Sequence, residues 1–157
     1  MEVEAKALLS ENWSVDVGYG YLDAEFDDYA RGPGQDFSGN KLARSPENTL
    51  NLSLSYSGEF RFGAIDARIG YSWHDKYYFE PDNNQIDPNS EQSSEGLLDA
   101  SMNFSLNNGW SVLLWGRNLS DERYRRSVLN AEGEPQRTAG IEPRTVGIRV
   151  TKEFWAN

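Results

Sequence analysis

Four arginines close together in the sequence form the only basic cluster of this chain: Arg117, Arg123, Arg125 and Arg126. Guanidinium groups hold anionic groups through paired, charged hydrogen bonds. Arg123, Arg125 and Arg126 are therefore candidates for capturing an anionic ligand. The alternative, which we favour, is that they pair with acids of the same segment, because those acids are so near. The acids are Asp121, Glu122, Glu132 and Glu134.

Metal-ligating residue types are scarce. His74 is the only histidine and cysteine is absent, so a transition-metal site would need carboxylates for its other ligands. We interpret His74 as a structural side chain beside Trp73. Residues 82–87 resemble the start of a calcium loop, but Asp87 and Ser93 stand where such a loop needs glycine and a bidentate glutamate. We therefore expect no metal site and no cofactor.

Composition excludes two further classes of function. The chain has 15 Lys and Arg against 25 Asp and Glu, a net charge of −10. Dedicated nucleic-acid binders carry a basic surface, so we expect no nucleic-acid partner. No nucleophile–base pair, phosphate-binding glycine loop or paired carboxylates stand at a recognisable spacing. We therefore expect no catalytic residues and no enzyme activity.

The elements that would position the arginines are strands, because the dominant hydrophobic period is two. In residues 13–21, apolar and aromatic side chains occupy the odd positions and small or polar ones the even positions. The same alternation marks five other stretches: 2–9, 49–56, 65–73, 98–106 and 146–151. Residues 110–117 also form a strand, but the apolar run 112–115 hides which face is which.

Connections alternate between short and long. We expect tight turns at residues 10–12, 57–59 and 107–109, and polar loops at about 27–47, 80–95 and 119–143. A compact soluble domain rarely needs three loops longer than roughly 12 to 15 residues, whereas an outer-membrane barrel has short turns on one side and long loops on the other. Aromatic residues cluster near the short turns, as in an interfacial girdle. A soluble β-sandwich remains the alternative, because its strands also alternate.

The number of strands sets a limit on what the chain can form. Seven strands are predicted, yet a closed bacterial barrel has an even number, from about eight upward. Open edges in a bilayer would expose unpaired backbone groups at several kcal/mol each. The predicted fold class is therefore all-β, an antiparallel transmembrane β-barrel meander that is part of a larger barrel. We expect a truncated gene product or an excised fragment, and a small passive porin-like or adhesive barrel is the remaining alternative.

Four segments resemble TonB-dependent outer-membrane receptors. Residues 117–124, Arg-Asn-Leu-Ser-Asp-Glu-Arg-Tyr, are similar to the Asn-Leu-x-Asp-x-x-Tyr motif near the end of these receptors. Residues 143–154, which start with Pro-Arg-Thr and end on an aromatic, resemble their last strand. Residues 19–26 and 39–50 resemble an earlier strand and the beginning of the next. The four stand in the order of the family and cover essentially the whole chain.

The resemblance implies a function and a set of partners. Residues 1–157 would be the C-terminal part of a 22-stranded barrel, with the plug domain and the TonB-binding segment absent. The whole receptor would import a scarce ligand, most simply a siderophore-type iron complex, across the outer membrane of a Gram-negative bacterium. Its partners would be membrane lipid, lipopolysaccharide, the rest of the receptor with its plug, and TonB through the missing part. Barrel assembly machinery would bind the last strand.

Overall fold

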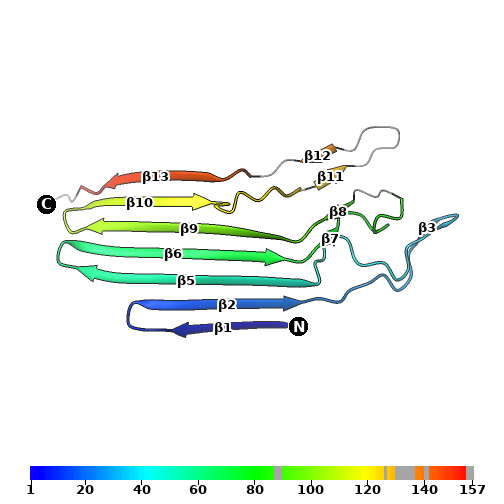
Figure 1. Cartoon of the computed structure of the whole chain (residues 1–157), viewed down its shortest axis with the longest axis horizontal. Helices are drawn as coiled ribbons and strands as arrows, with labels where there is room; N and C mark the ends of the chain where they lie inside the picture. The colour runs from blue at the N-terminus through cyan, green and yellow to red at the C-terminus, as the bar shows by residue number, and fades with distance from the viewer. Residues whose placement is uncertain (87–89, 126, 130–136, 140–141, 155–157) are drawn as a thin grey trace.

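The computed structural model describes residues 1–86, 90–125, 127–129, 137–139 and 142–154, which form one antiparallel sheet with three small hairpins at one end (Figure 1). In spatial order the sheet contains β1 (Glu2–Leu8), β2 (Trp13–Tyr21), β5 (Asn48–Phe60), β6 (Gly63–His74), β9 (Glu95–Leu106), β10 (Trp110–Arg117) and β13 (Thr145–Lys152). The hairpins pair β3 (Ala30–Gly32) with β4 (Gln35–Asp36), β7 (Tyr77–Tyr78) with β8 (Glu91–Gln92), and β11 (Ser127–Leu129) with β12 (Arg137–Ala139).

The large sheet is a meander in which each strand pairs with the next along the chain. Its longest continuous pairing runs between β5 and β6, from Thr49 opposite His74 to Phe60 opposite Gly63. The prediction of seven antiparallel strands is confirmed. The sheet is not closed, because β1 and β13 lie at opposite edges (Figure 1). The described residues include no helix that is long and apolar enough to cross a membrane.

The register places apolar and polar side chains on opposite faces of the sheet, because directly paired residues share a face. Leu54 pairs with Val15 and Ile69, and Ile69 pairs in turn with Ala100, so one face is apolar across these four strands. The register also settles the run that the sequence left ambiguous. Leu114 pairs with Met102 and Ile148 on the apolar face. Its neighbour Trp115 therefore belongs to the polar face.

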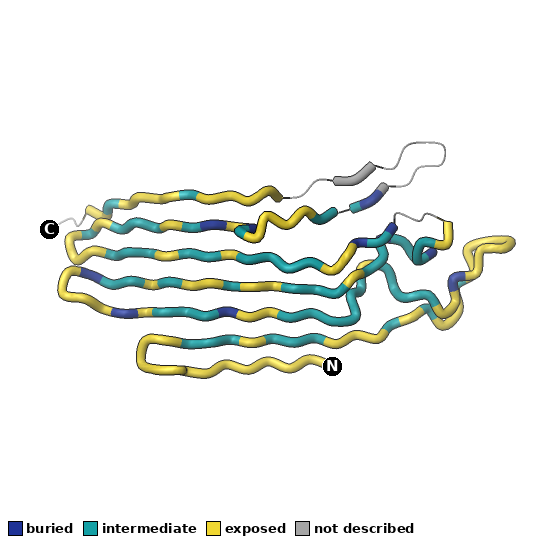
Figure 2. Tube along the Cα trace, in the orientation of Figure 1, coloured by how far each residue is buried: buried dark blue, intermediate teal, exposed yellow. Residues whose placement is uncertain are grey.

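The sheet has no packed core of its own. The buried apolar side chains of the described residues are Phe37, Phe79 and Val128, and all three lie in the long connections. Strand residues are mostly intermediate or exposed (Figure 2), and large apolar side chains such as Leu52 and Ile148 point outward. A sandwich would cover this apolar face with a second sheet, and the described residues form none there. A lipid-facing surface explains the exposure.

One predicted turn was wrong. Residues 57–59 lie inside β5, and the turn follows at Arg61 and Phe62. Ser57 is held in the ladder opposite Asp66, whose carboxylate accepts a hydrogen bond from the Ser57 hydroxyl at 2.7 Å. Gly58 lies beneath the ring of Tyr56, in a place that a side chain would fill. The small residues that suggested a turn therefore make room for an aromatic ring.

Candidate functional site

Three long connections meet at the end of the sheet opposite the short turns (Figure 1). We call them the first outer loop (residues 22–47, after β2), the second outer loop (residues 75–94, between β6 and β9) and the third outer loop (residues 118–144, after β10). The sequence predicted long loops here but not the hairpins inside them. The loops also contact one another.

Asparagine side chains join the first outer loop to the second. The Lys41 N–H donates to Asn83 Oδ1 at 2.7 Å, and Asn83 Nδ2 donates back to the Lys41 carbonyl at 3.0 Å. Asn40 Nδ2 donates to the Pro81 carbonyl at 2.9 Å, and Gln85 Nε2 donates to Asn40 Oδ1 at 3.0 Å. Asn83 has a φ of 46°, a left-handed conformation that asparagine tolerates better than most residues. The pair of reciprocal bonds fixes how the two loops sit together.

Lys41 also ties the first outer loop to itself. Its ammonium lies 2.6 Å from an Asp23 carboxylate oxygen and 3.0 Å from a Glu25 oxygen. Hydrogen bonds from Lys41 to these two acids raise the pKa of Lys41 above its ordinary value. One ammonium thereby offsets one of the two carboxylate charges, and it holds both acids within the loop.

Phe79 is the point at which all three outer loops meet. Its side chain is 3% exposed, and the guanidinium carbons of Arg44 and Arg125 lie 5.7 and 5.9 Å from its ring centroid. Tyr77 packs its ring edge to face against Phe79 at 5.3 Å, and burial raises the pKa of the Tyr77 phenol. The Arg44 N–H also donates to the Tyr78 carbonyl at 2.7 Å. One aromatic ring thus connects arginines from two loops through cation–π contacts.

The structure describes two of the three arginines predicted to capture a ligand, and it places them differently. Arg125 is half-buried: its N–H donates to Gln92 Oε1 at 2.9 Å and its guanidinium donates to the Glu91 carbonyl. Arg123 is exposed, and Arg126 lies outside the described residues. Glu132 and Glu134, proposed as pairing acids, also lie outside them. These two hydrogen bonds join Arg125 to the second outer loop.

Asn118 organises the start of the third outer loop. Its side chain is buried, and its Nδ2 donates at 2.9 Å to the carbonyls of both Glu122 and Glu142. Its Oδ1 accepts the Glu122 N–H at 3.0 Å, while its own N–H donates to Asp99 Oδ1 at 2.8 Å. These bonds hold the beginning of this loop against the residues that lead into β13. The Asn-Leu motif therefore has a structural reason to contain asparagine.

His74 makes structural contacts, as the sequence suggested. Its Nε2 lies 2.9 Å from Glu95 Oε1, and its Nδ1 lies 2.7 Å from the Asp75 carbonyl. Its ring packs against Tyr77 at 5.3 Å. Across the described residues, no three His, Cys, Asp or Glu side chains gather closely enough to hold a metal ion.

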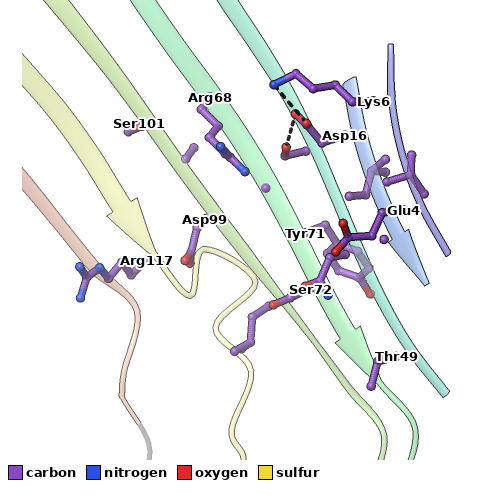
Figure 3. Close-up of a pocket in the computed structure, with 18 of the residues that line it drawn as sticks. Glu4, Lys6, Asp16, Thr49, Arg68, Tyr71, Ser72, Asp99, Ser101 and Arg117 are labelled. Atoms are coloured by element: carbon purple, nitrogen blue, oxygen red, sulfur yellow. Dashed lines mark hydrogen bonds and ion pairs between the residues drawn. The ribbon is translucent and has the colours of Figure 1, made fainter. Parts of the chain in front are cut away.

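The polar face of the sheet is concave and encloses a hollow of about 1280 Å³. We call the surface that lines this hollow the inner wall. Charged residues line it from several strands: Glu4 and Lys6 on β1, Asp16 on β2, Arg68 on β6 and Arg117 on β10 (Figure 3). Lys6 pairs with Asp16 at 3.5 Å, and the Ser53 hydroxyl donates to the same carboxylate at 3.4 Å. Among the described residues, the outer loops and the inner wall therefore form two separate polar surfaces.

Comparison with known proteins defines the class. The model of the family described as "TonB dependent receptor-like, beta-barrel" matches residues 1–119. The chain belongs to this family, so the resemblance seen in the sequence is confirmed. Members of the family are transport receptors of the Gram-negative outer membrane, and that is where this chain resides.

Individual relatives are distant. The chain is 26% identical over 150 residues to the pesticin receptor of Yersinia pestis, a match that covers 92% of this chain and 21% of that protein. Among solved structures it is similar to the ferric yersiniabactin uptake receptor FyuA of Yersinia pestis, with a TM-score of 0.80 and 24% identity over 98% of this chain and 23% of that one. The siderophore receptor PiuA of Acinetobacter baumannii follows with a TM-score of 0.68 and 22% identity over 95% of this chain and 20% of that one. The chain thus spans about a fifth of the length of its curated relatives.

Proposed function

We propose that residues 1–157 are the C-terminal part of the barrel of a receptor that takes up a siderophore-type iron complex and draws its energy through TonB. The family match over residues 1–119 carries the proposal. The names of similar proteins support the type of cargo, because two of the solved receptors are described by a siderophore or its ferric complex. The plug and the TonB-binding segment would lie in parts of the receptor outside this chain.

The open edges of the sheet support the proposal that further strands complete the barrel. β1 and β13 each have one paired side only, and an unpaired strand edge in hydrocarbon costs several kcal/mol per backbone group. Neighbouring strands of the same receptor would pair with both. The apolar face of the sheet would contact membrane lipid, and the arginines of the outer loops would contact lipopolysaccharide. The barrel assembly machinery would bind β13. The receptor would act by binding and transport, without enzyme activity or a resident cofactor.

The proposed ligand-facing groups are Arg123, Arg125 and Arg126 in the third outer loop. Arg123 is exposed and has no ion pair within 4.0 Å among the described residues. Arg125 is anchored beside Phe79, which holds its guanidinium in place ahead of binding. An anionic iron complex would accept forked hydrogen bonds from such groups.

Uptake and binding by the complete receptor test this proposal. Cells that lack their own iron uptake receptors would be given the complete gene, and radioactive iron bound to yersiniabactin would be supplied with TonB present or deleted. TonB-dependent accumulation is expected. Equal accumulation with and without TonB, or none with any siderophore extract from the source bacterium, would refute the assigned function.

A triple replacement tests the arginines separately. Changing Arg123, Arg125 and Arg126 to Gln should weaken binding of the transported complex by more than about 2 kcal/mol, because each charged hydrogen bond contributes roughly 1.5 to 3 kcal/mol. The matched control is Arg61→Gln, which lies in a short turn at the opposite end of the sheet. Unchanged affinity at low ionic strength would show that these arginines serve loop packing alone.

A further inference from the structure

Two oxygen atoms contact the ring of His74, one at each ring nitrogen. The ring lies at the outer end of the sheet, because His74 is the last residue of β6 and pairs with Glu95, the first residue of β9. Its Nδ1 lies 2.7 Å from the Asp75 carbonyl oxygen, and its Nε2 lies 2.9 Å from Glu95 Oε1. A carbonyl oxygen and an ionised carboxylate oxygen can only accept hydrogen bonds. Both ring nitrogens therefore face acceptors.

The number of protons in this arrangement follows from its geometry. A neutral imidazole carries one N–H, so it would donate to one of the two oxygens and direct a lone pair at the other. A nitrogen lone pair and an acceptor oxygen repel each other at distances of 2.7 and 2.9 Å. Both contacts are favourable only when one more proton is present, either on the ring as an imidazolium or on Glu95 as a carboxylic acid that donates to Nε2. His74 and Glu95 therefore share one proton.

Neighbouring hydrogen bonds hold the Asp75 backbone in place. The Asp75 N–H donates to the Asn48 carbonyl at 2.8 Å. The Asp75 carboxylate accepts Asn48 Nδ2 at 3.1 Å and the Lys76 N–H at 2.9 Å. These bonds tie Asp75 to the beginning of β5 and keep its carbonyl oxygen beside the ring. Glu95 is therefore the partner that must respond when the proton leaves.

Glu95 connects the ring to the outer loops. Its side chain is 8% exposed, and its Oε2 accepts a hydrogen bond from Gln92 Nε2 at 3.2 Å. Gln92 is buried at the end of β8, and its Oε1 accepts the backbone N–H of Arg125 at 2.9 Å. Along this chain of bonds, from the ring to the third outer loop, every donor faces an acceptor. Hydrogen bonds linked in this way strengthen one another, so loss of the proton at one end weakens the bond at the other.

Other charged and titratable side chains lie around the pair. Lys76 and Glu91 pair with each other at 3.3 Å. The other groups within electrostatic range of Glu95 or its neighbour Tyr77 come from all three outer loops: Arg44, Asp75, Tyr77, Glu122, Tyr124 and Arg125. Carboxylates, amines, guanidinium groups and phenols ordinarily keep their charge between about pH 5.5 and 8.5, whereas histidine changes its charge within this range. The His74 side chain is 25% exposed, so solvent can take up the proton.

We propose that the proton shared by His74 and Glu95 is a latch that joins the third outer loop to the end of the sheet. With the proton in place, Glu95 holds Gln92, and Gln92 holds the Arg125 N–H. As the pH rises and the proton passes to solvent, the Glu95 carboxylate turns away from Nε2, Gln92 loses its acceptor, and the Arg125 backbone is released. The latch goes beyond the proposed function, because it operates without cargo. Within that function, it would set the pH range in which the Arg125 guanidinium is held in place.

Hydrogen exchange at the Arg125 N–H tests the latch in the complete receptor, folded into lipid vesicles without siderophore. Exchange would be followed by mass spectrometry between about pH 5.5 and 8.5 and corrected for the intrinsic pH dependence of amide exchange. Protection of the Arg125 amide should fall about tenfold or more as the pH rises, the factor that one charge-assisted hydrogen bond corresponds to. The control is the Phe37 N–H, which donates to the Tyr29 carbonyl at 2.9 Å in the first outer loop and should show no such change.

Two replacements identify the group that titrates, after heat-modifiability on a gel has shown that each variant is folded. Glu95→Gln supplies an N–H that neutral His74 accepts at Nε2, while its Oε1 still accepts from Gln92, so the chain of bonds is complete without the extra proton. The Arg125 amide should then stay protected at about pH 8.5 and lose protection toward about pH 5.5, the reverse of the parent. His74→Gln has no such proton to lose, so protection should not depend on pH.

Protection of the Arg125 amide that does not change with pH in the parent would overturn the proposal, and so would a Glu95→Gln variant with the parent's pH dependence. If Glu95→Gln does not fold, His74→Gln decides alone: a fall in protection equal to that of the parent would show that another group titrates. Failure of siderophore uptake would leave these results unchanged, because no cargo is present. The latch and the proposed function can therefore fail separately.

Discussion

The two faces of β5 should respond in opposite ways to a charged side chain. Leu52 is 42% exposed on the apolar face, and its neighbour Asn51 is exposed on the polar face. Leu52→Arg puts a guanidinium into lipid. Asn51→Arg puts the same group into the polar interior, where the facing residue is Gly18. The two variants are matched in strand, depth and added side chain, so they differ only in the surroundings of the arginine.

The magnitude follows from where Leu52 lies along the strand. β5 runs Asn48–Phe60, so its centre is at Leu54 and Leu52 is two residues nearer the outer loops. Two residues span about 7 Å of strand, or about 5 Å along the membrane normal at a tilt near 40°. Arginine costs about 2 to 4 kcal/mol at the midplane and about 0 to 1 at the interfaces of an apolar band about 25 Å tall. Interpolation gives about 1.5 to 2.5 kcal/mol for Leu52→Arg, and close to zero for Asn51→Arg.

Denaturant unfolding of the complete receptor, folded into lipid vesicles, measures this difference. A loss of about 1.5 to 2.5 kcal/mol corresponds to roughly a 10- to 60-fold change in the folding equilibrium. The midpoint should fall for Leu52→Arg and remain close to that of the parent for Asn51→Arg. Equal losses at the two positions would refute the assignment of faces, and a loss confined to Asn51→Arg would mean that the register is inverted.

Three further predictions concern the outer loops. Phe79→Ala should lower hydrogen-exchange protection in all three loops at once, by about 3 to 5 kcal/mol, the loss that is typical when a buried aromatic side chain is removed. Phe62→Ala is the control: Phe62 is 68% exposed in a short turn, so its replacement should leave the protection of the loops unchanged. Asn118→Ala should reduce stability by about 1 to 3 kcal/mol in denaturant unfolding, because it removes a buried side chain that donates to two backbone carbonyls and accepts one N–H, and Asn118→Asp should rescue little of it. The pKa of Lys41 is raised above its ordinary value of 10.5, so its ion pair with Asp23 contributes fully below about pH 10.5 and is lost as the pH rises through the raised pKa. Hydrogen-exchange protection of the first outer loop should therefore fall only in that alkaline range. Lys41→Met should remove this pH dependence.

The strands could be predicted from the sequence because each separates two unlike environments. A barrel strand has lipid on one side and a polar interior on the other, so alternation is imposed at nearly every position. The turn at residues 57–59 was misplaced for a related reason. Serine and glycine are typical of turns, but here Ser57 bonds to Asp66 and Gly58 accommodates the ring of Tyr56. Only the contacts with Asp66 on β6 and with Tyr56 on β5 itself distinguish the two uses of the same residues.

The loop cluster could not be predicted, because its contacts join segments far apart in the chain. Arg44, Phe79 and Arg125 come from three separate loops, and no local pattern relates them. One signal was present in the sequence. The polar second outer loop contains a run of aromatic residues, Tyr77, Tyr78 and Phe79, whose types would suit a membrane girdle equally well. The burial of Phe79 shows that at least one of these rings packs within the loops instead.

The ambiguous run at residues 112–115 shows what the register adds to the pattern. Alternation alone allows either Leu114 or Trp115 to face the lipid, because an aromatic side chain in a membrane girdle is as reasonable there as an aliphatic one. Pairing of Leu114 with Met102 and Ile148 decides the matter, and it turns the indole of Trp115 toward the interior beside Arg117. An indole on the face away from lipid, 5.8 Å from the Arg117 guanidinium carbon, takes no part in a membrane girdle.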